Sequence, residues 1–241
     1  VNRMGWKKEN WTAQDYTELL QYLRESSESK FQQFQQRLIP DTAILGIRTP
    51  ELRSIAKEIA KGNVPGFLQV AQRDWHEERL LQGLVIGYWN VPFSERLEYL
   101  TSYLPLIDNW AICDMVCNTL TCFQKDAPEG FHYLLDLLQQ DNPWIIRFVL
   151  IMFLSHYLQD DYIDKVLEAS ASVTNDHYYV RMGNAWLLSV AFVKYRDKTV
   201  NLLKSSRLDD WTYHKTLQKI MESNRVDQVT KEWISTMKAL R

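Results

Sequence analysis

The sequence predicts an all-α protein, built as a HEAT-like, armadillo-type superhelix of stacked helical hairpins. Three observations lead to this fold class. Apolar residues recur at intervals near 3.6, as in Leu80, Leu81, Leu84 and Val85. Only eight glycines and seven prolines occur in 241 residues, which is few for a β protein rich in hairpins. Finally, an aromatic residue opens an apolar segment at a nearly constant interval.

That interval is set by Trp75, Trp110, Trp144, Tyr178 and Trp211, which lie 35, 34, 34 and 33 residues apart. A period in this range is typical of stacked helical hairpins, whose second helices line a concave surface. We predict inner helices that start near these five positions. They follow N-terminal helices over about 12–62, in a single domain that spans residues 1–241. Coincidental spacing within some other helical protein is the alternative.

Local signals mark the earlier helices. The segment Thr12-Ala-Gln-Asp15 has the form of a capping box and predicts a helix to about Arg24. Thr49-Pro50-Glu51 supplies a cap, a first-turn proline and an acidic first turn for a helix over 52–61, which Gly62 ends. A further helix is expected to open at Ser94.

Composition restricts the location and the kind of site. No apolar run is long enough to span a membrane, and the basic N-terminus lacks the apolar core of a signal peptide, so we expect a cytoplasmic protein. The three cysteines, Cys113, Cys117 and Cys122, form no CxxC pair. Reduced thiols in a helix are therefore expected, rather than a disulfide framework or a zinc site.

Charge is distributed unevenly along the chain, although the formal net charge is only −2. Residues 94–178 hold 4 Lys/Arg and 13 Asp/Glu, whereas residues 181–241 hold 12 and 6, a net charge of +6. Residues 1–93 are close to neutral, with 12 and 11. A polyanion is therefore expected to bind mainly at the C-terminal end, and a solvated helical surface is the alternative.

The repeat register brings several polar groups onto one predicted surface. Counted from the aromatic residue of each repeat, positions 0, +4 and +8 share a helix face, and +3 flanks it. These positions hold Asp114 at +4, Arg147, Arg181 and His214 at +3, Lys215 at +4, and Trp186 and Lys219 at +8. We expect one acidic, several basic and two or three aromatic side chains to converge on the concave surface.

Five segments follow one another over nearly the whole chain: Leu45-Gly-Ile-Arg-Thr-Pro-Glu-Leu-Arg53, Asn109-Trp-Ala-Ile-Cys-Asp114, Pro143-Trp-Ile-Ile-Arg147, Tyr179-Val-Arg-Met-Gly-Asn-Ala-Trp186 and the basic segment from Thr212 onward. Together they resemble the bacterial AlkD-like DNA alkylation repair family of HEAT-repeat glycosylases. The segment 209–225 follows a different branch from the best-characterised members.

The resemblance implies a monofunctional glycosylase that releases N3- or N7-alkylated purines from double-stranded DNA bound in a concave cleft. It makes Asp114 the catalytic carboxylate, Trp110 and Trp186 the walls of the cleft, and Arg147 the arginine beside them. Arg147 is also a candidate DNA contact, and further candidates are Arg48, Arg181, Lys215, Lys219 and Arg225. The implied protein needs no cofactor or metal, has no obligate protein partner and is a monomer.

Each assignment has a structural alternative. Trp110 and Trp186 could be core tryptophans, Asp114 and Arg147 could form a purely structural ion pair, and Arg181 could pair with Asp176. Two other functions remain open at this point: a non-catalytic DNA-binding protein of the same fold, and a scaffold for protein interactions.

Overall fold

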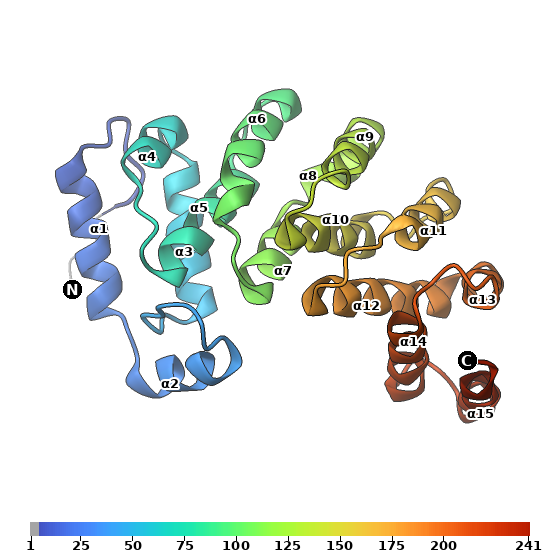
Figure 1. Cartoon of the computed structure of the whole chain (residues 1–241). Helices are drawn as coiled ribbons and strands as arrows, with labels where there is room; N and C mark the ends of the chain where they lie inside the picture. The colour runs from blue at the N-terminus through green and yellow to red at the C-terminus, as the bar shows by residue number, and fades with distance from the viewer. Residues whose placement is uncertain (1–4) are drawn as a thin grey trace. The chain divides into compact units, whose positions relative to one another are not determined.

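The computed structural model describes residues 5–241, whose regular secondary structure is entirely helical, with no β-strand. The predicted all-α class is therefore confirmed. The chain divides into two compact units, one up to Cys122 and one from Phe123 to Arg241. Figure 1 shows the helices of both units, coloured along the chain.

The first unit contains seven α-helices and one 3-10 helix, η1, among the described residues. They are α1 (Ala13–Glu25), α2 (Ser29–Leu38), α3 (Thr49–Ala60), α4 (Val64–Val70), α5 (His76–Tyr88), α6 (Phe93–Tyr103), η1 (Leu104–Leu106) and α7 (Trp110–Thr119). Helix α5 packs against α3 on one side and α7 on the other, and these three helices form a row. Helix α4 contacts α1, α3 and α5, and α6 contacts α5.

The second unit repeats this pattern with longer row helices. Its elements are α8 (Cys122–Lys125, which begins at the boundary), α9 (Ala127–Leu137), α10 (Pro143–His156), α11 (Ile163–Ser172), α12 (Tyr178–Lys194), α13 (Arg196–Lys204), α14 (Asp210–Glu222), α15 (Gln228–Met237) and η2 (Lys238–Leu240). Helix α12 packs between α10 and α14 (Figure 1). Helices α9, α11, α13 and α15 pack against this row. The apolar core from α11 to α15 centres on Leu188, Tyr213 and Leu217.

The five expected inner helices begin at residues 76, 110, 143, 178 and 210, within one residue of the aromatic positions. Side-chain caps explain several of these starts. The side-chain oxygen Oδ1 of Asn142 accepts hydrogen bonds from the backbone N–H groups of Trp144 and Ile145, at 2.9 and 3.4 Å. Asp209 caps α14 by accepting from the backbone N–H of Thr212 at 2.9 Å.

The N-terminal predictions are confirmed in one case and corrected in two. Thr12 and Asp15 form the reciprocal capping box that their spacing predicts. Thr49, however, is the first residue of α3 and not its cap, because Arg48 occupies the N-cap position without a side-chain hydrogen bond. Helix α6 begins at Phe93 rather than Ser94, after Pro92.

Among residues 5–241, no helix combines the length and the apolar composition that a membrane span requires. Cys113 and Cys117 are buried in α7, Cys122 is partly buried, and none of the three forms a disulfide, as predicted.

Candidate functional site

The N-terminal half of α7 carries two of the predicted site residues, Trp110 and Asp114. Trp110 is the first residue of the helix, and its indole N–H makes a long hydrogen bond, 3.5 Å, to the carbonyl oxygen of Leu38 at the end of α2. Both Trp110 and Asp114 are partly exposed, and they lie four residues apart. Ile112, Cys113, Val116 and Cys117 are fully buried on the opposite side of the helix. The indole and the carboxylate therefore share the accessible side of α7.

Asn109 fixes the start of this helix. Its side-chain oxygen accepts a hydrogen bond from the backbone N–H of Ile112 at 3.0 Å. The amide nitrogen is then free to donate, and it contacts Nδ1 of His76 at 3.1 Å and a carboxylate oxygen of Asp108 at 2.9 Å. Because Nδ1 must accept here, the buried His76 is neutral and carries its proton on Nε2.

His76 is held neutral by its surroundings as well as by this hydrogen bond. Burial lowers the pKa of its imidazole below the usual value. The carboxylates of Glu77 and Asp108 raise that pKa, and Arg79 lowers it. His76 and Asn109 are therefore buried residues that hold the N-terminus of α7 in place. The spacing of the repeats did not predict this role for either residue.

The loop 45–47 in the Leu45-Gly-Ile signature is built around Glu77, in the first turn of α5. The backbone N–H groups of Leu45, Gly46 and Ile47 donate to the Glu77 carboxylate at 2.9, 2.8 and 3.3 Å. Gly46 adopts a positive φ of 92°, a region that favours glycine. Glu77 has no exposed surface. This part of the signature is therefore structural, and it ties the α2–α3 connection to α5.

In the second unit, Arg147 on α10 is directed into the contact with α12. Its side chain is only 5% exposed, and Nη1 donates to the carbonyl oxygen of Tyr179 at 2.8 Å. The guanidinium also lies 5.7 Å from the centre of the Tyr179 ring. A Cβ atom on Gly183 would stand 3.4 Å from the Arg147 side chain, so the small residue on α12 leaves room for it. Arg147 thus provides a fixed, largely buried positive charge.

Helix α14 places two predicted cations near that charge. Burial lowers the pKa of the Lys219 ammonium, Glu222 opposes the shift, and the positive charges of Lys215 and Arg147 add to it. Lys215 lies 5.5 Å from the centre of the Trp211 ring and donates to Gln218 at 2.9 Å. The second unit therefore brings Arg147, Lys215 and Lys219 into one electrostatic environment.

Aromatic side chains extend along the N-terminal ends of α10, α12 and α14. Trp144 packs against His177 and Tyr179, with ring centroids 5.4 and 5.3 Å apart, and Tyr178 packs against Trp211 at 5.8 Å. Tyr178 is 55% exposed. His177 caps α12 by accepting the backbone N–H of Tyr179 at Nδ1. Trp186, further along α12, is partly exposed and is not a fully buried core tryptophan.

The other predicted DNA contacts are placed as follows. Arg181 pairs with Asp209 at 3.6 Å and not with Asp176. Asp209 is the N-cap residue of the neighbouring helix α14. Arg225 is exposed in the loop after α14. Arg48 is exposed in the first unit, where it pairs with Glu28 at 3.2 Å and lies over Phe31.

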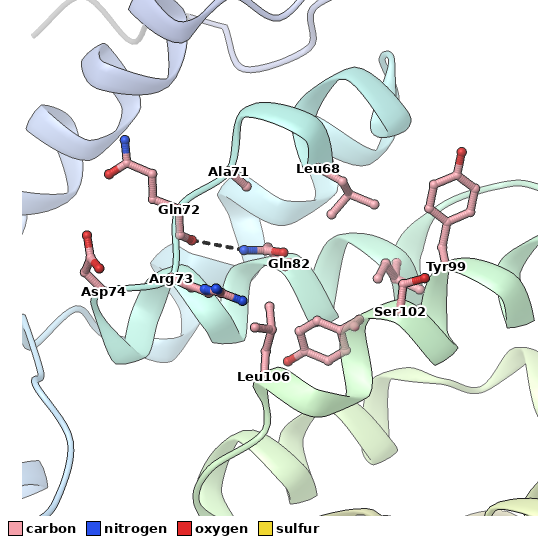
Figure 2. A pocket seen from close by; sticks show the side chains of 11 residues that line it. Leu68, Ala71, Gln72, Arg73, Asp74, Gln82, Tyr99, Ser102 and Leu106 are labelled. Atoms are coloured by element: carbon pink, nitrogen blue, oxygen red, sulfur yellow. Dashed lines mark hydrogen bonds between the residues drawn. The ribbon is translucent and has the colours of Figure 1, made fainter.

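A hollow of about 500 Å³ in the first unit contains none of the predicted site residues. It lies between the α4–α5 connection and α6, and Gln82, Arg73, Tyr99 and Ser102 are among its lining residues. Figure 2 shows Gln82 donating to the carbonyl oxygen of Gln72, a 3.0 Å hydrogen bond. Within residues 5–241, no group of His, Cys, Asp or Glu side chains is arranged to hold a metal ion.

A family model described as "DNA alkylation repair enzyme" matches residues 18–207. This range includes Trp110, Asp114, Arg147, Arg181 and Trp186 and ends before α14. No curated protein and no solved structure gives a significant match to the chain.

Proposed function

Because the chain belongs to the DNA alkylation repair enzyme family and therefore has a role in DNA repair, we propose that it is a monofunctional DNA glycosylase. In this proposal it hydrolyses the N-glycosidic bond of N3- or N7-alkylated purines in duplex DNA and leaves an abasic site. The observation that carries the proposal is the pair Trp110 and Asp114, an indole and a carboxylate that remain accessible on the same side of α7.

The chemistry of the lesion explains why a carboxylate is the central group. Alkylation at N3 or N7 makes the purine cationic, so the base departs as a neutral molecule and needs no strong acid. Positive charge instead develops on the deoxyribose as the bond breaks. A carboxylate near C1′ stabilises that charge and orients the attacking water. We assign this role to Asp114.

The aromatic and cationic residues support this step. The electron-rich faces of Trp110 and Trp186 favour a cationic base or sugar by about 0.5–2 kcal/mol and exclude water. Since Arg147 is largely buried, we propose that it acts through its fixed charge, which favours the ionised form of a nearby carboxylate, more than as a surface contact for phosphate.

DNA binding is assigned to five cations that are exposed or partly exposed. We propose that Lys215, Lys219, Arg225, Arg181 and Arg48 neutralise backbone phosphates, which makes the affinity for duplex DNA depend steeply on salt. The proposal requires that both units bind the same duplex, as parts of one HEAT-like domain over residues 1–241. It includes no cofactor. A monomeric state and a cytoplasmic location remain predictions.

The direct test is release of free base from a duplex that contains 7-methylguanine. At about 4 Å and an effective dielectric near 20, the Asp114 carboxylate contributes at most roughly 4 kcal/mol, or about three decades of rate. Asp114→Asn should therefore release base up to about a thousandfold more slowly and keep its affinity for duplex DNA. Asp161→Asn, which removes an exposed carboxylate outside the site, is the matched control.

The same assay separates the alternatives. A folded protein that binds duplex DNA with strong salt dependence but releases no base would be a non-catalytic DNA-binding member of the family. A protein with no affinity for duplex DNA would fit a scaffold for protein interactions instead.

A further inference from the structure

A second group of cations lies in the first unit, at the C-terminal ends of α3 and α5. It surrounds a hollow of about 710 Å³, whose lining includes Lys7, Lys57, Lys61, Tyr88, Trp89 and Asn90. No acidic residue lines the hollow. We call these six residues the basic hollow. The three lysines are separated by up to 54 residues in the sequence, so only the fold brings them together.

The N-terminal segment is fastened to the turn between α3 and α4, which brings Lys7 close to Lys61. The backbone N–H of Asn63 donates to the carbonyl oxygen of Lys8 at 2.8 Å, and the Asn63 side chain donates to that of Glu9 at 3.1 Å. A side chain at Gly62 would collide with the Lys8 backbone, so this close approach requires glycine.

The aromatic wall of the basic hollow is fixed as well. The Lys57 ammonium lies 5.3 Å from the centre of the Tyr88 ring. Nη1 of Arg53 donates to the Tyr88 hydroxyl at 2.7 Å and thereby adds a fourth cation behind the ring. Trp89 packs at 80° against Tyr99, with centroids 5.1 Å apart, and remains partly exposed.

The positive charge of the basic hollow is not balanced within the described part of the chain. None of its three lysines forms an ion pair among residues 5–241. The C-terminal dipoles of α3 and α5 contribute about half a negative charge each, which leaves a net charge of roughly +2 for the three lysines alone.

Three of the 11 carboxylates that make residues 1–93 nearly neutral are engaged elsewhere in the unit. Glu77 is buried against the loop 45–47, Glu78 accepts from Tyr16 at 2.5 Å, and Glu51 accepts from Tyr22 at 2.6 Å. The sum of charges over this region therefore conceals an exposed basic surface.

We propose that the basic hollow binds the sugar–phosphate backbone of the DNA strand beside the damaged nucleotide. Lys7, Lys57 and Lys61 neutralise phosphates, and Trp89 packs on a sugar or base. Sequence-independent strand binding uses this combination of cations and aromatic rings. This inference rests on the proposed function, which supplies DNA as the ligand. It adds a DNA contact in the first unit to the DNA contacts that we assigned to the C-terminal quarter of the chain.

The position of Arg53 relates the basic hollow to the proposed catalytic residue. Nη1 of Arg53 also donates to Thr119, the last residue of α7, at 2.8 Å. Thr119 follows Asp114 by five residues, about 7.5 Å along the helix axis. Arg53 thereby links Tyr88 of the basic hollow to the C-terminal end of the helix whose N-terminal half carries Asp114.

The test compares the salt dependence of duplex binding in matched variants. Lys57→Gln/Lys61→Gln removes two cations from the basic hollow. Lys125→Gln/Lys165→Gln removes two exposed lysines from the acidic region 94–178 and is the control. Fluorescence anisotropy with a labelled undamaged duplex gives the affinity at several salt concentrations. For two lost phosphate contacts, the slope of log K against log salt should fall by about two, and affinity near 0.15 M salt should fall on the order of tenfold.

Trp89→Leu gives a different expected signature. It should weaken duplex binding a few-fold and leave the salt slope unchanged, because apolar packing of an indole against a deoxyribose releases no counterions. If the Lys57/Lys61 variant matches its control in slope and affinity, the basic hollow is not a phosphate site. The inference would also be overturned if Lys57→Gln/Lys61→Gln changed the binding of a poly-glutamate peptide but left the binding of duplex DNA unaltered.

These outcomes are independent of the glycosylase proposal. If the slope changes as expected but the unaltered protein releases no 7-methylguanine, the basic hollow stands and the proposed reaction fails. If base is released and the lysine variants bind like the control, only the basic hollow fails.

Discussion

Glu77 gives the sharpest prediction about stability, because its carboxylate is fully buried and accepts three backbone hydrogen bonds. In Glu77→Gln, the amide oxygen can keep the bonds to Gly46 and Ile47. The amide NH₂ then faces the N–H of Leu45, which loses its acceptor. A nearly isosteric change therefore removes one bond and the charge that strengthens the other two.

The magnitude follows from these contacts. An N–H group left without its acceptor costs about 1–3 kcal/mol of stability. For Leu45 we expect a cost of about 1–2 kcal/mol, because this residue is only partly buried. Losing the charge from the remaining two bonds adds about 0.5 kcal/mol each, since charge-assisted bonds are roughly twice as strong as neutral ones. We expect Glu77→Gln to lower the free energy of unfolding by about 2–3 kcal/mol. For a chain of this length, that shifts the melting temperature by roughly 4–12 °C.

Thermal unfolding followed by circular dichroism measures the global effect, with the exposed Glu58→Gln on α3 as the control. Because the chain has two compact units, hydrogen exchange at residues 45–47 provides a local readout. Exchange there should accelerate in Glu77→Gln and not in the control. If Glu77→Gln melts within about 1 °C of the unaltered protein and protects these amides equally, the loop does not depend on the carboxylate.

Two further predictions concern the support beneath Trp110. Asn109→Ala should lower the free energy of unfolding by about 2 kcal/mol, because it removes the α7 cap and leaves Nδ1 of the buried His76 without its donor. Denaturant unfolding measures this loss, and Asn118→Ala, at an exposed position of the same helix, is the control. Base release should slow in Asn109→Ala, because the next residue is Trp110, and an unchanged rate would show that the cap does not position it. The lowered pKa of His76 predicts that stability falls as pH decreases below about 6.5, where the unfolded chain takes up a proton that the folded one does not. His76→Gln should lose less stability between pH 7 and pH 5, and superimposable pH profiles for the two proteins would contradict this assignment.

The helical elements were predictable because their signals are local. The capping box at Thr12 and the aromatic residues that open α7, α10 and α12 act within one or two helical turns. The same holds for the placement of Trp110 and Asp114 on one side of α7, which follows from their spacing of four residues.

Pairing between distant residues was not predictable in the same way. Arg181 was a candidate partner for Asp176, five residues earlier, but it pairs with Asp209, which caps the neighbouring helix. Arg147 was expected at the surface of the cleft, and the structure instead buries it against Tyr179 of α12. In both cases the outcome depends on how adjacent row helices pack.

The helical class, the positions of the row helices and the family to which the chain belongs could be read from the amino-acid sequence, because periodicity, caps and ordered motifs are carried by neighbouring residues. The use of the charges became visible only in the folded chain. The tertiary structure placed Glu77 and Glu78 inside the first unit and gathered Lys7, Lys57 and Lys61 on its surface. Electrostatic interactions depend on distance and burial in the folded chain, and a count of charges along the sequence contains neither.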